Sequence, residues 1–219
     1  MTFFVSSAAS QKTLSQYIIE VRRLLHDATG NYWSDAELTD YINEARNRMV
    51  ADTGCNRILQ TVTLNTAQEV YSLASLPQGI STIDVLNITV LWGTMRVPLN
   101  YMVFTEFNMK MRAWQSYQSR PVAFSVYAQS NVYVGPIPDQ PYTSEWDTVV
   151  IPPALVNPTD VDSILFPYTS GISFYAAYLA KYKEQSIDEA ERFYESYKAK
   201  AREANRSSFT RRLHSVFGG

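Results

Sequence analysis

Hydrophobic positions along this chain follow two different spacings, and the spacing changes twice. From Thr13 to Gly30, and again after Ser34, apolar residues recur every three or four positions, which predicts two amphipathic helices. From Arg57 onward, short runs alternate apolar and polar positions, which indicates β-strands, and helical spacing returns at Ser170. We therefore predict an α+β fold in which N- and C-terminal helix pairs form an antiparallel helical bundle with an inserted antiparallel β region of sandwich or barrel type.

The element boundaries follow these changes of period and the Pro- and Gly-containing breaks between them. Strands are expected over residues 58–65, 69–73, 81–92, 96–103 and 145–151, a hairpin over 122–127 and 131–134, and a short helix over 105–117. We divide the chain into a flexible N-terminal arm (1–12), a helical bundle (13–56 and 169–205), an inserted β-rich region (57–168) and a C-terminal docking tail (206–219).

The turn between the first two helices is the most strongly specified local feature. Ser34 can accept a hydrogen bond from the backbone N–H of Glu37, and the Glu37 carboxylate can reach back to the N–H of Ser34. Trp33 can pack on Leu38 across the same helix start. We expect these four residues to form a structural helix corner of fixed angle. The same capping pair recurs at two other predicted helix starts, Thr13 with Gln16 and Ser186 with Glu189.

The second predicted helix has an apolar face and a charged face. The apolar face carries Leu38, Tyr41, Ile42, Ala45 and Met49, whereas Asp40, Glu44, Arg46 and Arg48 lie largely off it. A DNA-reading helix-turn-helix is the less favoured interpretation of this corner. Three acids near the leading end of the helix, Asp35, Glu37 and Asp40, would meet phosphates with the wrong sign.

Composition narrows the class of protein. The 219 residues are 46% hydrophobic and 18% charged with a net charge of −2, which gives the whole chain no electrostatic preference for nucleic acid or anionic lipid. Cys55 is the single cysteine, so no intramolecular disulfide is expected. No segment has the length of an apolar membrane span, which predicts no membrane partner. The abundance of Tyr and Phe fits a β core and equally fits interfaces.

Residues of the kinds used in catalysis are present without a catalytic context. The histidines are His26 and His214, and neither lies near a plausible Ser or Cys nucleophile. Carboxylate pairs such as Asp160 with Asp162 lie in loops or first helical turns, and Asp84 alone lies within an apolar run. There is no Gly-rich phosphate loop and no metal-ligand spacing. We therefore expect no catalytic residue, no metal and no cofactor.

The C-terminal stretch is locally basic on an acidic chain. Its cations fit the end of a helix followed by a solvated tail, but apolar residues alternate with the arginines, as expected for a segment that becomes ordered on a partner. We favour docking on a partner over a disordered tail. The candidate docking residues are Arg206, Phe209, Arg211, Arg212, Leu213, Val216 and Phe217.

The order of these pieces resembles the head-to-tail connector, or adaptor, proteins of tailed bacteriophages. The resemblance covers residues 14–204 and is carried mainly by VRRLLHD (21–27) followed by YWSDAELTDYINEA (32–45). The supporting segments are SRP (119–121), VGPIPD (134–139), YAAYLA (175–180) and AERFYESY (190–197).

The resemblance implies a structural virion protein at the head-tail junction, assembled in the host cytoplasm. Copies would form a ring, commonly a dodecamer, beneath the portal, with the C-terminal residues on the portal protein and the β region facing tail or nozzle proteins. The ring would line the DNA channel, which admits non-specific contact with packaged DNA. Ring or core packing would fall on Tyr175, Leu179, Phe193 and Tyr197. A virion-associated peptidoglycan hydrolase and a DNA-binding regulator stay as alternatives.

Overall fold

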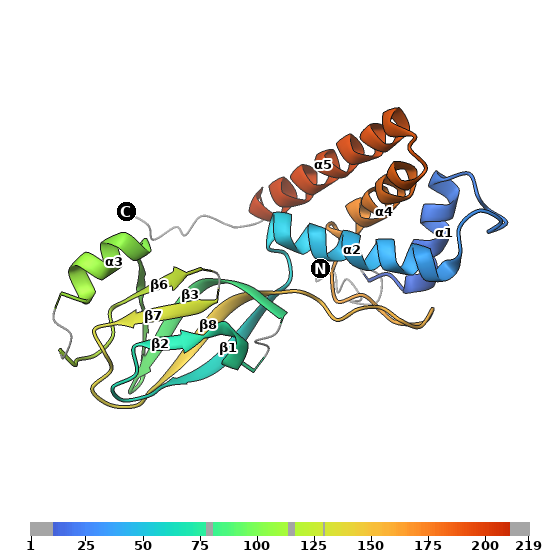
Figure 1. Ribbon diagram of the computed structural model, residues 1–219. Coiled ribbons are helices and arrows are strands. Elements are labelled where there is room, and N and C mark those ends of the chain that lie inside the picture. Colours follow the sequence, from blue (N-terminus) through green and yellow to red (C-terminus); the bar gives the residue numbers. More distant parts are fainter. Residues whose placement is uncertain (1–10, 78–80, 114–116, 129, 211–219) are drawn as a thin grey trace. The chain divides into compact units, whose positions relative to one another are not determined.

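The chain folds into a helical unit and a β unit. The computed structural model describes residues 11–77, 81–113, 117–128 and 130–210, with only the backbone described for 207–210. Residues Met1–Asn56 and Pro152–Gly219 belong to the helical unit, and Arg57–Ile151 form the β unit (Figure 1). This α+β arrangement of terminal helices around an inserted β region confirms the predicted fold class. Residues 152–168, which the sequence pattern placed with the β region, belong to the helical unit instead.

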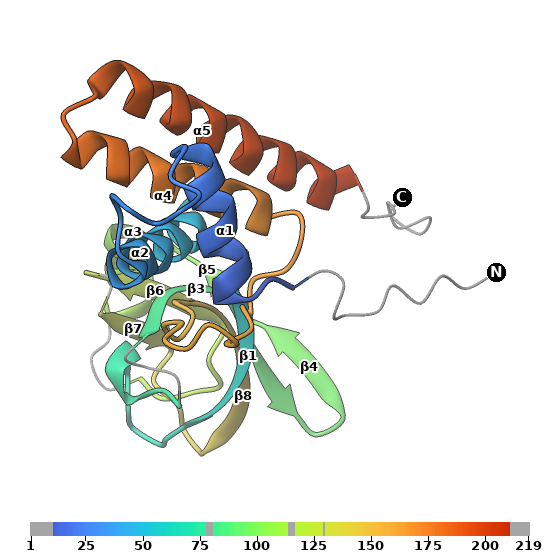
Figure 2. The ribbon, with the colours of Figure 1, turned by 90° about the vertical axis from the view of Figure 1, so that its right-hand side faces the viewer.

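Four helices form the helical unit: α1 (Leu14–Leu24), α2 (Asp35–Thr53), α4 (Thr169–Lys183) and α5 (Ile187–Thr210). Helix α4 packs against the other three, and it runs antiparallel to α5 (Figure 2). Small residues let α4 approach its neighbours closely. A Cβ added at Gly171 would lie 2.6 Å from Met49 Cε and 3.5 Å from Tyr197 Cδ2. The small residue at this position therefore serves close packing of α4 on α2 and α5.

Two helix ends differ from the sequence expectation. The first helix stops at Leu24, before Gly30, because Leu25 caps it and His26 adopts a left-handed conformation with φ of 58°. The last helix continues to Thr210, so the first residues of the predicted tail are helical. The capping box of Thr13 with Gln16 is present in full, and α2 ends at Thr53, where Gly54 caps it with φ of 61°.

The β unit is a sandwich of two four-stranded sheets. The first has the order β1-β8-β3-β4, formed by β1 (Arg57–Leu64), β8 (Tyr142–Val150), β3 (Thr82–Trp92) and β4 (Met95–Pro98). The second has the order β2-β7-β6-β5, formed by β2 (Val70–Ser72), β7 (Asn131–Gly135), β6 (Ala123–Tyr127) and β5 (Asn100–Tyr101). All pairs are antiparallel except β5 with β6, and a short 3-10 helix, η2 (Leu73–Ser75), follows β2. Their facing sides form one apolar core that includes Leu64, Ile88, Phe124, Val132, Val134 and Trp146.

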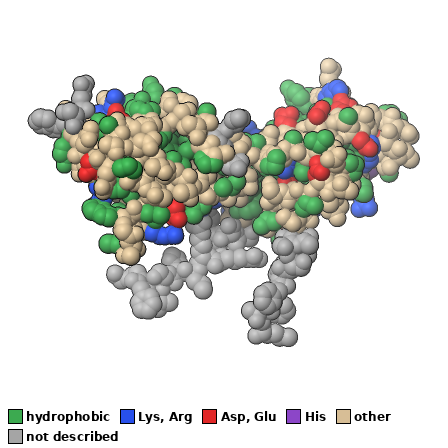
Figure 3. Space-filling model, turned by 90° about the horizontal axis from the view of Figure 1, so that it is seen from below, with side chains coloured by type: hydrophobic (Ala, Val, Ile, Leu, Met, Phe, Trp, Pro, Cys, Tyr) green, Lys and Arg blue, Asp and Glu red, His purple; other side chains and the backbone are tan. Residues whose placement is uncertain are grey.

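A short helix, α3 (Phe104–Met111), covers the outer side of the second sheet. The rings of Phe104 and Tyr133 lie 5.0 Å apart, and Phe107 is fully buried. The contact is close because Gly135 has no side chain: a Cβ there would lie 2.8 Å from both Phe107 Cζ and Met111 Cβ. Around this core, green apolar side chains are spread over the face of the β unit shown in Figure 3 rather than gathered in one patch.

Candidate interaction site in the helical unit

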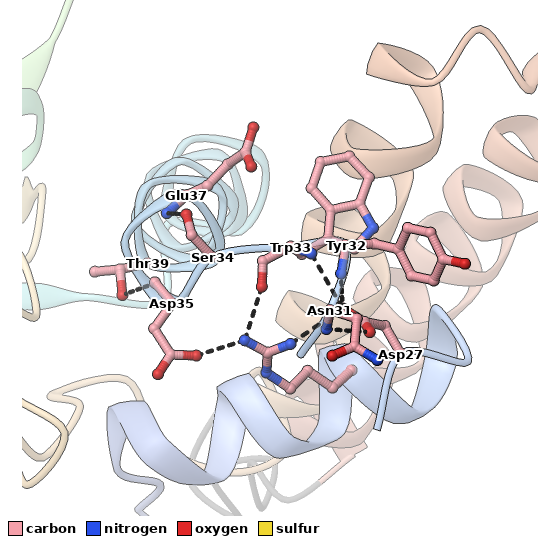
Figure 4. Close-up of polar contacts among 9 residues, drawn as sticks. Asp27, Asn31, Tyr32, Trp33, Ser34, Asp35, Glu37 and Thr39 are labelled. Carbon is pink, nitrogen blue, oxygen red and sulfur yellow. Dashed lines mark hydrogen bonds and ion pairs between the residues drawn. The ribbon is translucent and has the colours of Figure 1, made fainter. Parts of the chain in front are cut away.

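The corner between α1 and α2 is organised by a buried aspartate. Asp27 is 3% exposed. Its Oδ1 accepts from the backbone N–H of Asn31 at 2.9 Å, and its Oδ2 accepts from those of Tyr32 at 3.3 Å and Trp33 at 3.1 Å (Figure 4). One carboxylate thus binds three consecutive backbone donors and fixes the path of the loop.

Arg22 ties this loop to both helices. Its Nη1 donates to Asp27 Oδ2 at 3.1 Å, while Nη2 donates to the Trp33 carbonyl at 2.8 Å and to Asp35 Oδ1 at 2.6 Å. A side chain at Gly30 would occupy the guanidinium's place, since its Cβ would lie 2.8 Å from Arg22 Nη1 and its φ is 72°. Arg22 and Asp27 therefore hold together the end of α1, the loop and the first residue of α2.

These contacts shift the pKa of Asp27. Burial alone acts to raise the pKa, but the N–H groups of Trp33, Asn31 and Tyr32, together with the charge of Arg22, stabilise the carboxylate and lower the pKa below its usual value. A lowered folded pKa means that the ionised form stabilises the fold. This stabilisation is complete above the unfolded pKa and is lost as pH falls through the folded pKa.

The Asp27→Asn variant should therefore be less stable than the wild type at neutral pH, because the amide keeps the shape but loses the charge. The difference in melting temperature should narrow as pH falls below about 4, the usual pKa of an aspartate in an unfolded chain. Thermal unfolding of both proteins at neutral pH and at a series of lower pH values measures this difference. Asp40→Asn, at an exposed position of α2, is the control and should show no such pH-dependent gap. A gap for Asp27→Asn that is constant with pH would contradict the assignment.

Half of the capping box expected at this corner forms. Ser34 Oγ accepts from the N–H of Glu37 at 3.2 Å, but the Glu37 carboxylate accepts from the Tyr41 hydroxyl at 3.2 Å and from Lys183 instead of turning back to Ser34. Trp33 is 6% exposed and contacts Tyr41 edge-on at 6.1 Å, so it belongs to the core of the helical unit, as does the fully buried Leu38. The adjacent Tyr32 is 84% exposed.

A groove of about 440 Å³ lies beside the corner, between α1, α2 and residues 154–158. Its apolar lining comes from Leu14, Ile18, Ala36, Ala154, Leu155, Val156 and Pro158. Its polar lining comes from Asp35, Thr39, Asp40 and Asn43. The groove is therefore an apolar surface with carboxylates among its walls.

A buried ion pair fixes the segment that forms one wall of this groove. Arg46 and Asp162 are 1% and 0% exposed. Asp162 Oδ1 accepts from Arg46 Nη2 at 2.8 Å and from the Ile164 N–H at 3.0 Å, and Oδ2 accepts from the Tyr17 hydroxyl at 2.9 Å. Arg46 Nη1 also donates to the Pro153 carbonyl at 2.9 Å. These bonds join α1, α2 and the 152–164 segment.

Two further polar side chains complete the wall. Asn43 binds both backbone groups of Leu155, donating to its carbonyl and accepting from its N–H, each at 2.9 Å. Asp160 accepts from the N–H groups of Val156 and Asn157 at 2.8 Å, and these backbone bonds lower its pKa. The groove is thus built by directed hydrogen bonds on a segment without regular secondary structure.

The aromatic residues predicted for packing lie on α4 and α5. Tyr197 is 1% exposed and donates to Asp52 Oδ2 at 2.7 Å, and its ring lies 4.9 Å from that of Tyr175. Burial and the neighbouring carboxylate raise the pKa of Tyr197. Tyr175, Leu179 and Phe193 are partly exposed. Tyr197 therefore contributes to the core, whereas the other three keep part of their surface available for other contacts.

The predicted C-terminal docking residues fall mostly outside the described residues. Arg206 lies on α5 and is exposed, and Phe209 lies in the part of α5 where only the backbone is described. Arg211, Arg212, Leu213, Val216 and Phe217 lie beyond the described residues. Within α5, Lys198 and Lys200 form ion pairs with Glu195 and Glu203.

The residues of the kinds used in catalysis, Asp84, His26 and Cys55, lie apart from one another in the chain. Asp84 is exposed on β3, where its carboxylate accepts from the N–H of Val85 at 2.8 Å next to a register shift. His26 is exposed in the corner loop. Burial raises the pKa of the Cys55 thiol. Among the described residues, no group of His, Cys, Asp and Glu side chains is arranged to hold a metal ion, and no helix is long and apolar enough to cross a membrane.

Sequence reasoning missed the residues that organise this region, namely Arg22, Asp27, Tyr32, Arg46 and Asp162. A buried Arg46 was detectable in principle, because it follows Ile42 by four positions and precedes Met49 by three, which places it beside the apolar face. The partner of Arg46 was not detectable, since 116 positions separate Arg46 from Asp162.

Comparison with known proteins identifies the family. No curated protein sequence matches the chain. The family model described as SU10 adaptor protein matches residues 12–216, which span both units and all the candidate docking residues except Phe217. This match confirms the resemblance to phage connectors. The chain therefore belongs to the SU10 adaptor protein family, a family of phage head-tail adaptors.

Proposed function

We propose that this protein is a structural virion component that forms a ring between the portal and the tail and lines the DNA channel. The observation that carries the proposal is the family match over residues 12–216, which spans nearly the whole chain. A ring of identical copies requires subunits that hold their contact surfaces at constant angles. The corner is held by the hydrogen bonds of Arg22 and Asp27, and the 152–164 segment is held by those of Arg46 and Asp162. These bonds supply the required rigidity in the helical unit.

The β unit offers surfaces for tail or nozzle proteins. The β3–β4 hairpin projects from its sheet (Figure 2) and turns at Gly93, where φ is 58° and no atom lies within 4 Å of an added Cβ. The two residues beside the turn are apolar and exposed, Trp92 by 47% and Met95 by 68%. Arg120 stacks on Trp92 at 3.9 Å from the ring centre. We assign tail contacts to this tip and to the loop over 136–142.

A structural role is favoured over the hydrolase alternative by the state of the buried acids. Asp27 and Asp162 are the buried carboxylates among the described residues, and each is bonded to an arginine and to backbone N–H groups. A general acid would need a proton at neutral pH, which the lowered pKa of Asp27 opposes. Asp162 is 0% exposed and so does not face a substrate. Clearing of peptidoglycan by the purified protein in a zymogram would contradict the structural proposal.

Removing residues 211–219 should weaken recruitment to the portal. The cut lies after Thr210, so α5 stays intact. Loss of the Arg211 and Arg212 charges and of the apolar Leu213, Val216 and Phe217 should weaken binding by about tenfold or more, because apolar anchors dominate such contacts. Co-sedimentation of purified portal with each protein measures recruitment.

A matched pair of full-length variants locates the effect. Phe217→Ala should reproduce much of the loss, whereas Ser215→Ala should bind as the wild type does. If the shortened protein loads on the portal as well as the full chain, the C-terminal residues are not the docking segment.

A further inference from the structure

The corner presents one aromatic side chain to solvent on a rigid support. Tyr32 is 84% exposed, the most exposed of the large apolar residues described, although its own N–H and those of Asn31 and Trp33 are bound to Asp27. In Figure 4 its ring points away from Asp27 and Asp35. A tyrosine on a fixed backbone loses little conformational entropy on binding, which is the property of an interface anchor.

The groove between α1, α2 and residues 154–158 is suited to bind such an aromatic side chain. Its volume is about 440 Å³, and its lining combines the exposed apolar side chains of Ala36, Ala154 and Pro158 with the buried Leu14, Ile18 and Leu155. Its walls are fixed by the Asn43 and Arg46 hydrogen bonds. Val156 lines the groove and is itself 72% exposed, which leaves apolar surface open to a partner.

The charges of the corner and the groove are complementary. Arg23 is the exposed lysine or arginine of residues 23–34, and the one acid in that stretch, Asp27, is buried. Two acids line the groove: Asp35, which forms an ion pair with Arg22 of its own copy, and Asp40, which is exposed. A corner approaching the groove of another copy therefore brings Arg23 toward Asp40, which favours this pairing over corner with corner or groove with groove.

We propose that Tyr32 of one copy inserts into the groove of the neighbouring copy. The inference rests on the proposed ring and names one contact within it. Because the two surfaces differ, each copy gives one anchor and receives another. Such a heterologous contact builds a ring where the rotation between copies closes, and it does not build a two-fold dimer. Asp27 and Arg22 act as positioning residues for Tyr32. The Arg46–Asp162 pair positions the segment that forms one wall of the groove.

Two surface substitutions disrupt opposite halves of the contact. Tyr32→Ser removes the anchor, and Ala36→Trp fills the groove from an exposed position in the first turn of α2. Each should lower the number of copies retained on purified portal by about tenfold, measured by the mass of the complex. Tyr117→Ser, at a tyrosine of the β unit that is 58% exposed, is the matched control and should leave ring loading unchanged.

Cysteine pairs test the geometry directly on a Cys55→Ser background. A mixture of Tyr32→Cys copies and Val156→Cys copies should form disulfide-linked dimers under mild oxidation on the portal. Neither variant alone should form them, because a heterologous contact never places two copies of one residue together.

The outcomes separate this inference from the proposed function. If the wild type loads on portal while both surface variants load equally well and no mixed disulfide forms, the Tyr32 contact is wrong and the adaptor role stands. If the wild type itself does not load on portal, the proposed function fails. Disulfides within the Tyr32→Cys copies alone would show a two-fold contact and overturn the heterologous arrangement.

Discussion

Replacing Asp162 with alanine is expected to destabilise the helical unit by about 3–5 kcal/mol, because the change leaves a buried charge without its partner. Arg46 is 1% exposed and would keep its guanidinium away from water. The Tyr17 hydroxyl and the N–H of Ile164 would lose their acceptor at the same time. The cost is therefore that of an unpaired ion together with two unsatisfied donors.

Native-state hydrogen exchange on α1 and α2 in the full chain measures this loss as a lower free energy of opening. Glu184→Ala is the control in the same unit. It removes an exposed acid whose partner, Lys181, keeps a second ion pair with Glu189 at 3.1 Å, so the expected change is about 0–1 kcal/mol. Equal effects of the two substitutions would show that the buried pair does not hold the unit together.

A double replacement distinguishes an unpaired charge from a lost contact. Arg46→Met combined with Asp162→Leu removes both ions and keeps apolar volume, and it should recover part of the stability lost in Asp162→Ala. Recovery should be incomplete, because Pro153 and Asn43 also accept hydrogen bonds from Arg46. No recovery at all would mean that the hydrogen bonds to the 152–164 segment matter more than the balance of charge.

Local sequence patterns could predict most elements because their causes lie within a few residues. The Thr13 and Gln16 side chains and their helix start are three positions apart, and the hairpin of β6 and β7 joins neighbouring segments. The end of α1 differs from the prediction because its cause is a side chain in the loop beyond the helix. Apolar spacing continues past Leu24, but Asp27 binds the N–H groups that follow and stabilises a loop in place of another helical turn.

Long-range contacts could not be predicted in the same way. Strand β1 pairs with β8, and Gln60 donates to Thr148 across 88 positions, a pairing that no local pattern specifies. Residues 152–164 contain no periodic signal, so they were grouped with the strands before them. Their position depends on directed bonds to Arg46 and Asn43 on α2. The candidate groove depends on these contacts. The sequence could indicate which of its residues are apolar, but it could not indicate that they lie next to one another in the fold.

Replacing Trp146 with alanine is expected to destabilise the β unit by about 3–5 kcal/mol, the usual cost of removing a large buried aromatic side chain. Trp146 is fully buried on β8, in the first sheet, and its ring lies 6.0 Å from that of Tyr71 on β2, in the second. Its Nε1–H donates to Ser144 Oγ at 2.8 Å. The substitution therefore opens a cavity between the two sheets and removes the donor that orients Ser144.

Hydrogen exchange on β7 and β8 measures the effect of Trp146→Ala, and Trp92→Ala supplies a control of the same chemistry. Trp92 ends β3 with 47% of its surface exposed, and its loss should cost only about 0.5–1 kcal/mol, the value of its stacking with Arg120. The two variants should also differ in which property they change, stability or binding to tail proteins. Trp146→Ala should lower the stability of the whole sandwich, whereas Trp92→Ala should leave the sandwich intact and weaken binding to tail proteins. If Trp92→Ala destabilises the β unit as much as Trp146→Ala, the hairpin tip belongs to the fold and is not free to serve as a tail contact.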